Sequence, residues 1–487
     1  MIDLINMASY KPTIGLEIHA ELNTKTKMFC ACPNDPLEKE ANKNICPICM
    51  GHPGTLPVAN REAIVKLIRV GLALNCTIES RTYFERKNYF YPDLTKGYQI
   101  SQFQTPFCRN GYLEIGSHHK KIRIERIHLE EDAGKLIHDY DPDWSLADYN
   151  RAGVPLMELV TRPDLDSPED VRLFAQELQL ILRYVNTSDA DMEKGQMRVE
   201  VNISLAPEGE EKLGTKVEVK NINSISAASR AAMYEIERQT IALEAGETIV
   251  QETRGWDDVH QKTTHQRIKE GSADYRYFPE PDLPPVVISD DELESIRVSV
   301  PELPEQRRKR FHEEYGPPVS DVEIFVVSRE LGDFYEEVVS ELKRENNPES
   351  GEAKDYSKLS KVAANWLIAH RPENTKITPA LFADFVVRVS GGQITSAAAQ
   401  IVLEIMGKTG EDPEDIIREK DLGQVSDSAS LNVIVEDVIA QLPKVAQDFK
   451  DGKEAAMKAL VGKVMALSKG KANPQIAEQI LREKLNN

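Results

Sequence analysis

The chain has 487 residues, of which 40% are hydrophobic and 29% are charged, so it is long enough to form two to four folded domains. Its formal net charge of −20 excludes a general nucleic-acid coat protein, because such proteins bind phosphates through clustered lysines and arginines. The N-terminus lacks the pattern of a signal peptide, no run approaches the roughly twenty apolar residues of a membrane span, and six cysteines without an export signal favour reduced thiols in the cytoplasm.

The first part of the chain, residues 1–295, mixes short alternating segments with helical ones. Alternation of apolar and polar residues predicts half-buried strands at 123–131, 196–205 and 215–224. Helical periodicity predicts helices at 61–74, 167–185 and 226–246, the second of which has a typical start at Ser167-Pro168. Because strands and helices follow one another in no regular order, we expect an α+β domain with an antiparallel or mixed sheet.

The Pro-rich, acidic stretch at 279–293 ends this domain, and the pattern after it is mainly helical. We predict an all-α helical domain at 296–407 and a small all-α tail domain at 408–487. Five apolar residues line one face of a tail helix, namely Met457, Leu460, Val461, Val464 and Met465, and Asn473-Pro474 is a typical start for the final helix.

Four of the six cysteines form two close pairs. Cys30 and Cys32 are followed after thirteen residues by Cys46 and Cys49. Two such pairs across a loop match the spacing of a tetrahedral zinc site, although the first pair is tighter than the usual C-x-x-C. We predict a structural zinc loop at 30–49, since four protein ligands leave no open position; unpaired cysteines or a redox pair are the alternative.

Acidic residues stand in or next to apolar strand patterns at several places. Glu17 and His19 lie two apart in TIGLEIHAEL, so both point to the same face of a strand. Glu158 is a lone carboxylate in the apolar run VPLMELV, where burial is costly unless a cation compensates the charge.

A second acidic group occurs in RIERIHLEEDAGK. His128, Glu130 and Asp132 share one face of the predicted strand, and Glu131 points the other way. Three carboxylates and one imidazole that converge would suit Mg²⁺ or Mn²⁺ holding a nucleoside triphosphate. Solvated charges on strand faces are the competing interpretation.

Nucleotide chemistry would also need groups that bind phosphate. No Walker loop is present, because Val402 stands where the first glycine would precede Gly407-Lys408-Thr409. An ATP site would therefore use scattered basic and amide side chains, for which the candidates are Lys87, Asn88, Asn150, Arg151, Lys220, Asn221 and Arg276.

Several of these strings resemble one known family. IGLEIHAEL, RKNYFYPDLTKGYQISQ, HLEEDAGK, DYNRAGVPLMELV, VEVKNINS and GSADYRYFPEPDLPP are similar to the GatB/GatE family, the B-type subunits of aspartyl/glutamyl-tRNA amidotransferases and their E-type relatives. The tail string FKDGKEAAMKALVGKVMALSKGKANP looks like the same family's C-terminal domain. E-type members carry an inserted domain before the helical part, and ELPEQRRKRF follows the Pro-rich exit directly here, so the B type fits better.

The resemblance implies a ligase that works as part of a complex. It would act with an amidase-type A subunit and a small C subunit on mischarged Glu-tRNA(Gln) or Asp-tRNA(Asn). Its N-terminal cradle domain would use ATP and Mg²⁺ to phosphorylate the side-chain carboxylate. Ammonia released from glutamine in the A subunit would then displace the phosphate and leave the amide.

The resemblance also implies roles for individual residues. The Mg²⁺ ligands would be Glu17, His19, Glu130 and Glu158, with Glu130 and Glu131 the pair whose assignment is open. Lys87, Lys96 and Glu131 resemble the lining of an ammonia channel. Zn²⁺ would bind the four cysteines in the zinc loop that only some members possess.

The tail carries an excess of basic residues that suits a tRNA backbone. Its candidate tRNA-binding residues are Lys453, Lys458, Lys463, Lys469 and Lys471.

Two other functions remain as alternatives: a stand-alone zinc-containing RNA-binding protein with no catalysis, and a free-standing ATP-dependent ligase acting on a soluble small molecule. No membrane partner is expected.

Overall fold

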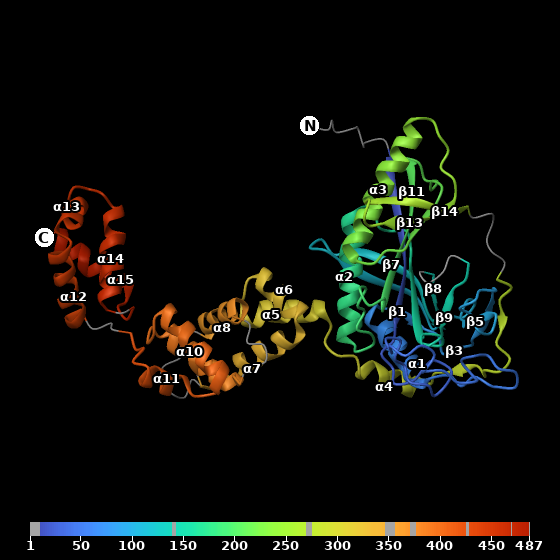
Figure 1. Ribbon diagram of the computed structural model, residues 1–487, viewed down its shortest axis with the longest axis horizontal. Coiled ribbons are helices and arrows are strands. Elements are labelled where there is room, and N and C mark those ends of the chain that lie inside the picture. The colour runs from blue at the N-terminus through green and yellow to red at the C-terminus, as the bar shows by residue number, and fades with distance from the viewer. Residues whose placement is uncertain are drawn as a thin grey trace. The chain divides into compact units, whose positions relative to one another are not determined.

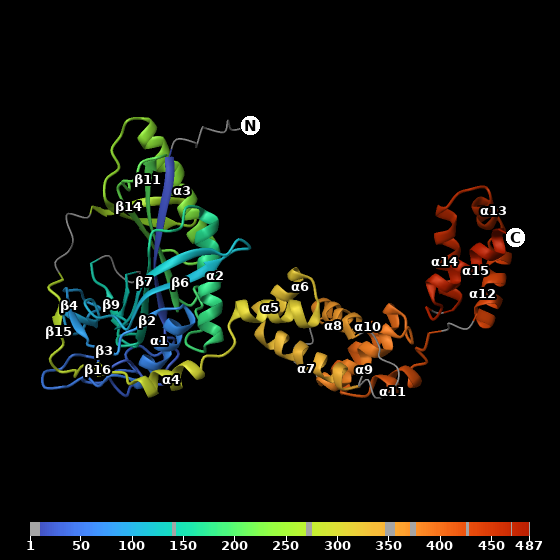
Figure 2. The ribbon, with the colours of Figure 1, turned by 180° about the vertical axis from the view of Figure 1, so that it is seen from behind.

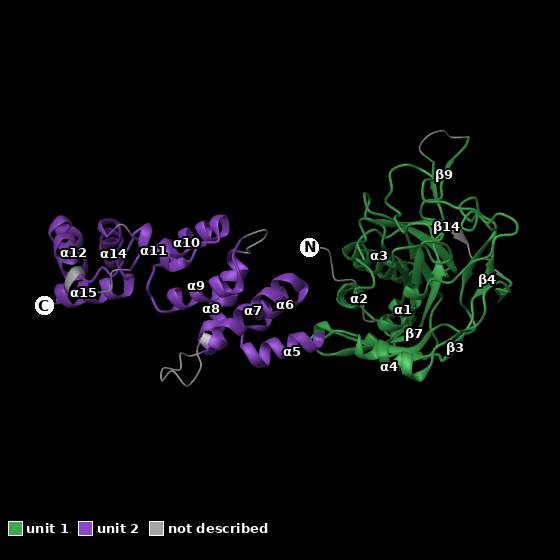
Figure 3. Ribbon diagram, turned by 90° about the horizontal axis from the view of Figure 1, so that it is seen from below, with its two compact units in different colours: residues 1–304 green, residues 305–487 purple. Residues whose placement is uncertain are grey.

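The computed structural model describes residues 10–138, 143–268, 275–345, 356–370, 376–424, 428–468 and 470–486. The chain divides into two compact units, residues 1–304 and 305–487 (Figure 3). The first unit is built on sheets with helices and the second is helical, which confirms the predicted α+β class. None of the helices in the described ranges is long and apolar enough to cross a bilayer.

A nine-stranded mixed sheet forms the centre of the first unit (Figure 1). All neighbouring strands are antiparallel except β12 and β13. The spatial order of the strands is β14 (Lys262–Ile268), β13 (Glu252–Asp257), β12 (Val217–Lys220), β11 (Met197–Pro207), β1 (Tyr10–Glu21), β10 (Pro155–Thr161), β7 (Lys120–Glu131), β6 (Cys108–Ile115) and β2 (Thr77–Ile78).

Three smaller sheets lie in the described part of the same unit. They consist of β15 (Phe278–Pro279), β4 (Glu85–Asn88) and β5 (Tyr98–Ser101); of β16 (Val286–Val287) and β3 (Arg81–Thr82); and of β8 (Lys135–Ile137) and β9 (Leu146–Asp148). In the first of these sheets, Lys87 and Asn88 lie on β4. This strand pairs with β5, which ends just before Gln102.

Helices cover one face of the large sheet. They are α1 (Arg61–Ala73), α2 (Pro168–Tyr184) and α3 (Ile225–Glu244), with α4 (Asp290–Val298) against α1. Figures 1 and 2 show α2 and α3 beside each other along the sheet. The buried core there combines Leu16 and Ile18 of β1 with Phe174 of α2, so the alternating polar residues of β1 face the other way.

The predicted elements of this unit are present. The predicted helices at 61–74, 167–185 and 226–246 correspond to α1, α2 and α3, and the Ser167 hydroxyl accepts a hydrogen bond from the Asp170 amide at the start of α2. The predicted strand at 123–131 lies in β7, and the one at 196–205 corresponds to β11. The predicted strand at 215–224 is shorter, because β12 ends at Lys220, where Asn221 adopts a left-handed backbone with φ of 60°.

The second unit contains eleven helices within its described ranges: α5 (Pro304–Tyr315), α6 (Val319–Val327), α7 (Arg329–Glu345), α8 (Tyr356–His370), α9 (Pro379–Ser390), α10 (Ser396–Thr409), α11 (Pro413–Glu419), α12 (Ser428–Gln441), α13 (Pro443–Lys450), α14 (Ala455–Leu467) and α15 (Pro474–Asn486). The predicted apolar face of α14 packs in the core of the tail, and the Asn473 side chain caps α15. The domain limits at 295, 407 and 487 stay a prediction; α10 runs past residue 407 and ends before Gly410.

Candidate functional site: a carboxylate–imidazole cluster and a four-cysteine loop

The polar face of the large sheet brings together residues from three neighbouring strands. His19 of β1 stands opposite Glu158 of β10, and Glu158 stands opposite His128 of β7. Residues paired directly across strands project from the same face. The three side chains therefore form a row over the centre of the sheet, with Glu130 two residues further along β7.

Glu158 lies between the two imidazoles. Its Oε2 atom is 3.5 Å from His19 Nε2 and 3.4 Å from His128 Nε2. Glu130 contacts the same pair, with 3.7 Å from Oε1 to His19 Nε2 and 3.7 Å from Oε2 to His128 Nε2. The hydroxyl of Ser101 donates to Glu130 over 3.1 Å. His128, Glu130 and Glu158 are buried, and His19 is partly exposed at the edge of this cluster. Nδ1 of His128 has no hydrogen-bond partner among the described residues.

The charged groups of the cluster shift one another's pKa values. Burial acts against ionised His19, but its hydrogen bond to Glu158 and the charges of Glu158 and Glu130 raise the pKa of His19 to about 9. Burial likewise acts against ionised Glu158, but the His128 and His19 imidazoles hold the pKa of Glu158 well below its usual range. The cluster therefore holds carboxylates whose negative charge is compensated by protons on imidazole, and a divalent cation can replace those protons.

Glu17 extends the cluster along β1. One ligand atom each from Glu17, His19 and Glu158 lie within 4.8 Å of one another, and the same holds for His128, Glu130 and Glu158. Burial, with the charges of Glu158 and Glu200, raises the pKa of Glu17. The structure thus brings Glu17, His19, Glu130 and Glu158 together, as the sequence analysis expected, and adds His128 as a contact of both central carboxylates.

A second acidic group was missed by the sequence analysis. Glu200 of β11 stands opposite Glu17, and Glu17, Glu200 and Glu218 place one carboxylate oxygen each within 4.8 Å of one another. Lys220 Nζ lies 2.8 Å from Glu200 Oε2 and 3.9 Å from Glu218 Oε2. The signal was present, because Glu200 and Glu218 are single carboxylates in the strand patterns VEVNISL and VEVK, as Glu158 is in VPLMELV.

Lys87 is linked to the cluster by charge. Burial favours its neutral amine, but the carboxylates of Glu130 and Glu158 hold the pKa of Lys87 above its usual range. Its Nζ also lies 5.3 Å from the ring centre of Tyr275. Lys87 and Lys220, both from the predicted phosphate-binding set, therefore carry charges that are coupled to the carboxylates of these two acidic groups.

The predicted phosphate-binding set also includes Asn88, Asn221 and Arg276. The Asn88 amide donates to the carbonyls of Tyr275 and Arg276 over 3.1 and 2.8 Å. Asn221 and Arg276 adopt left-handed backbone conformations, with φ of 60° and 45°. Such backbone in residues other than glycine often marks functional sites.

Asn150 and Arg151 bind neighbouring segments in this structure. Asn150 accepts from the Asn44 amide over 2.8 Å and donates to the Glu40 carbonyl over 2.8 Å, so it fastens the cysteine loop. Arg151 donates to the carbonyls of Ala133 and Gly134 over 3.0 and 2.9 Å. Roles in ATP binding for these residues stay a prediction.

Glu131 points away from the cluster and forms a separate site with Lys96. The Lys96 Nζ atom lies 2.6 Å from the Glu131 carboxylate, which also accepts from the Ile100 amide over 2.9 Å. This pair borders a cavity of 210 Å³ that is also lined by Cys30 and Cys49. Glu130 and Glu131 therefore lie in different environments. Of the two, Glu130 is the one that lies beside His19 and Glu158.

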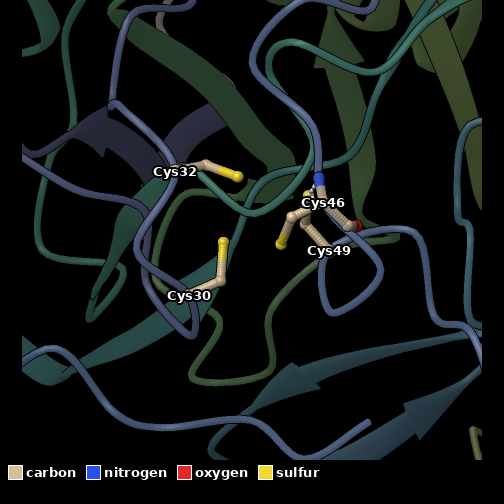
Figure 4. Close-up of side chains that lie close together, drawn as sticks. All are labelled: Cys30, Cys32, Cys46 and Cys49. Atoms are coloured by element: carbon tan, nitrogen blue, oxygen red, sulfur yellow. Dashed lines mark hydrogen bonds between the residues drawn. The ribbon is translucent and has the colours of Figure 1, made fainter.

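The four predicted zinc ligands converge. The side chains of Cys30, Cys32, Cys46 and Cys49 point toward one common centre (Figure 4), and all four sulfur atoms lie within 4.8 Å of one another. Tetrahedral Zn²⁺ with Zn–S bonds of roughly 2.3 Å holds neighbouring sulfurs about 3.8 Å apart. The Cys46 and Cys49 sulfurs are 3.9 Å apart, and all six cysteines are free of disulfides.

The thiols of this loop differ in acidity. A hydrogen bond with the Cys30 thiol, together with the Cys46 amide and the Lys27 ammonium, lowers the pKa of Cys49 to about 5 against the effect of burial. Burial and the Cys46 thiol raise the pKa of Cys32 to about 11. The loop therefore combines an easily ionised thiol with thiols that a thiophilic cation would have to deprotonate.

The predicted tRNA-binding lysines of the tail fall into two groups. Lys453 pairs with Asp448 over 2.8 Å, and Lys471 pairs with Asp421. Lys458 and Lys463 lie on α14 and form no ion pair with the described residues. Lys469 lies outside the described residues. Binding of tRNA by these residues stays a prediction.

Fold and site together define an α+β protein that carries a buried carboxylate–imidazole cluster and a tetrathiol loop, joined to a helical unit. Residues 12–294 match the family model described as the GatB/GatE catalytic domain, and residues 352–485 match the one described as the GatB domain. The chain therefore belongs to the GatB/GatE family, which confirms the resemblance seen in its motifs.

Relatives match over almost the whole chain. The B-type subunit of the aspartyl/glutamyl-tRNA(Asn/Gln) amidotransferase of Thermoanaerobacter pseudethanolicus is 46% identical over 479 residues, which cover 98% of this chain and 99% of the relative. The proteins of the same name from Caldicellulosiruptor saccharolyticus and Thermotoga maritima are 45% and 44% identical, with the same coverage of both chains.

Proposed function

We propose that this chain is the carboxylate-activating subunit of a glutamine-dependent tRNA amidotransferase, an ATP-dependent carbon–nitrogen ligase. It would phosphorylate the side-chain carboxylate of Glu-tRNA(Gln), Asp-tRNA(Asn) or both, and then amidate it to give Gln-tRNA(Gln) or Asn-tRNA(Asn). The observation that carries this proposal is the buried cluster in which Glu158 lies within 3.5 Å of both His19 and His128. The names of the similar proteins supply the substrate class.

The reaction explains why such a cluster is needed. A carboxylate does not react usefully with ammonia, whereas an acyl phosphate does. A side-chain oxygen would attack the γ-phosphorus of ATP, form the acyl phosphate and release ADP. Ammonia would then attack the acyl carbon, and inorganic phosphate would leave with the oxygen atom that came from the carboxylate. Catalysis of the first step depends on positioning and on neutralising charge.

The residues of the cluster fit Mg²⁺. Glu17, Glu130 and Glu158 could supply the oxygen ligands that this ion prefers, and His19 a nitrogen ligand. Glu158 belongs to both groups of close ligand atoms, the one with Glu17 and His19 and the one with His128 and Glu130. The unpartnered Nδ1 of the buried His128 is a further sign that the cluster, among the described residues, is incomplete as it stands. A bound Mg²⁺ would neutralise the phosphate oxygens of ATP.

The chain's own cations would complete the phosphate site. Lys87 is coupled by charge to Glu130 and Glu158, and Lys220 to Glu200 and Glu218. When ATP phosphates enter, these ammonium groups can exchange a carboxylate partner for a phosphate partner. We propose that both lysines bind and orient the nucleotide, assisted by Asn88, Asn150, Arg151, Asn221 and Arg276.

The Lys96–Glu131 pair fits the delivery of ammonia. Its cavity of 210 Å³ lies on the side of β7 away from Glu130, so a nitrogen donor could approach the activated carboxylate from a separate direction. Ammonia attacks only in its neutral form, and the Glu131 carboxylate is placed to accept a proton from ammonium. Lys87 would line the inner end of the same path.

The partners and the zinc loop complete the proposal. We propose that an amidase-type A subunit and a small C subunit form a heterotrimer with this chain in the cytoplasm, and that Zn²⁺ held by Cys30, Cys32, Cys46 and Cys49 has a structural role. We propose that basic residues of the tail contact the tRNA backbone, namely Lys453, Lys458, Lys463, Lys469 and Lys471.

Reconstitution tests the proposed function. The chain, combined with both partner subunits, should convert mischarged Glu-tRNA(Gln) or Asp-tRNA(Asn) to the amide only when ATP and a nitrogen donor are present. The chain alone should be inactive. Amidation of free glutamate without tRNA would instead support a soluble small-molecule ligase, and failure with both tRNAs would refute the proposal.

A further inference from the structure

Lys27 is a lysine buried completely beside the cysteine loop. Its side chain is 0% exposed, although lysine is almost never fully buried without a partner. The Nζ atom donates to the carbonyls of Asn44 and Tyr149 over 2.7 and 3.3 Å, and it lies 4.0 Å from Cys49 Sγ. Within the described ranges of the chain, no carboxylate forms an ion pair with it.

The three contacts of Lys27 Nζ differ in the charge that they can offer. Two of the three N–H groups point to backbone carbonyls, which carry no net charge. The third contact is with Cys49 Sγ, at 4.0 Å. A divalent cation held by the four cysteines would bind them as thiolates, so the buried Lys27 side chain would lie directly beside an anionic ligand atom.

The backbone places Lys27 against both halves of the cluster. The Lys27 amide donates to the Cys32 carbonyl over 3.0 Å, while its side chain reaches Cys49. A Cβ at Gly153, where φ is +86°, would lie 3.5 Å from Lys27 Cδ and 3.6 Å from Cys49 Cβ. The Lys27 stem and Cys49 thus lie beside the same short backbone segment at Gly153.

We propose that Lys27 is a built-in counter-charge of the four-cysteine site and strengthens its binding of a thiophilic divalent cation such as Zn²⁺. Four thiolates around Zn²⁺ carry a net charge of −2, and the ammonium reduces the charge of the buried group to −1. Lys27 acts here as a positioning residue rather than a ligand, because it contacts a ligand sulfur and two carbonyls of the surrounding loops. The inference rests on the proposed zinc site and is independent of the ligase activity.

Zinc affinity of the full-length chain tests this inference. Lys27→Gln retains N–H donors for the two carbonyls but removes the charge, and Lys27→Met removes both. Lys66→Gln is the matched control, since Lys66 is 6% exposed and its Nζ contacts Asn23 and Asn186 instead of a cysteine. Zinc is removed from each protein and titrated back against a chelator of known affinity.

Both Lys27 variants should bind zinc about 10 to 100 times more weakly than the wild type, the range typical for residues that support metal ligands. Lys66→Gln should stay within about twofold of the wild type. If Lys27→Met fails to fold, Lys27→Gln decides the matter alone. Unchanged affinity of Lys27→Gln, or a wild-type chain that binds no zinc, would overturn the inference. Amidation by the wild-type complex is measured separately, so failure of the ligase proposal and failure of this inference are distinguishable.

Discussion

Replacement of Glu158 by glutamine removes the central charge of the cluster while keeping the size of the side chain. The Oε2 atom of Glu158 lies 3.5 Å from His19 and 3.4 Å from His128, and the side chain is 7% exposed. Glutamine offers a neutral oxygen in the same place. We therefore expect a folded protein that assembles with its partners but has lost most of its capacity to hold a cation and an ATP phosphate.

The expected size of the effect follows from these distances. At an effective dielectric constant of about 20, a pair of opposite unit charges at the separation of Glu158 and His19, 3.5 Å, attracts by about 5 kcal/mol. Part of this attraction energy is recovered in the variant, because the imidazoles lose their protons when the carboxylate is absent. A remaining loss of about 3 to 4 kcal/mol in the transition state corresponds to a rate lowered by about 100- to 1,000-fold.

The assay follows ADP and amidated tRNA in the reconstituted complex with saturating mischarged tRNA and ammonium. Glu158→Gln should lower both products together, because acyl-phosphate formation precedes amidation. The matched control is Glu169→Gln on α2, whose carboxylate is 59% exposed and pairs with Arg172. The control should retain wild-type rates. A folded Glu158→Gln complex with activity within about threefold of the wild type would refute the assignment of the site.

Three further outcomes test other parts of the molecule. Lys96→Met, which removes the ion pair with Glu131, should lower glutamine-dependent amidation by about tenfold while glutamine hydrolysis by the partner continues; equal loss of both activities would contradict a role in delivery of ammonia. Burial raises the pKa of Glu21 from its usual value near 4.5 to about 7, so ionisation destabilises the folded state increasingly between these pH values. Glu21→Gln should therefore be more stable than the wild type by about 1–3 kcal/mol at pH 8, with the difference in unfolding free energy shrinking toward pH 5, and a constant difference would contradict the assigned shift. Lys458→Ala with Lys463→Ala should weaken tRNA binding and reduce the slope of log affinity against log salt by about 1–2, whereas an unchanged slope would exclude these lysines from the interface.

Much of the site could be predicted because strand periodicity is local. The spacing of Glu17 and His19 places both on one face of β1, and the same rule separates Glu130 from Glu131 on β7. The spacing of the four cysteines predicted their convergence. These predictions need only the geometry of a single strand or loop.

The remaining features depend on which strands become neighbours. That His19 meets Glu158 follows from the pairing of β1 with β10, whose register no local pattern contains. The pattern marks Glu200 and Glu218 as single carboxylates in strands, but only the pairing of β11 with β1 and β12 brings them together with Glu17.

Polar side chains that bind a neighbouring loop have no sequence pattern that distinguishes them from side chains that bind a nucleotide. Asn150 lies in the string DYNRAGVPLMELV, which resembles the family, and its side-chain amide binds the cysteine loop more than one hundred positions earlier in the sequence. The pairing of Lys471 with Asp421 likewise joins residues fifty positions apart.

The fate of the carboxylate oxygen tests the central claim most directly. Mischarged tRNA whose glutamate or aspartate side chain carries ¹⁸O would be amidated by the wild-type complex with ATP and glutamine, and the inorganic phosphate would be analysed by mass. If the carboxylate is phosphorylated before ammonia attacks, each amide formed leaves one ¹⁸O atom in inorganic phosphate. Phosphate without ¹⁸O, formed at the same rate as the amide, would contradict activation through an acyl phosphate.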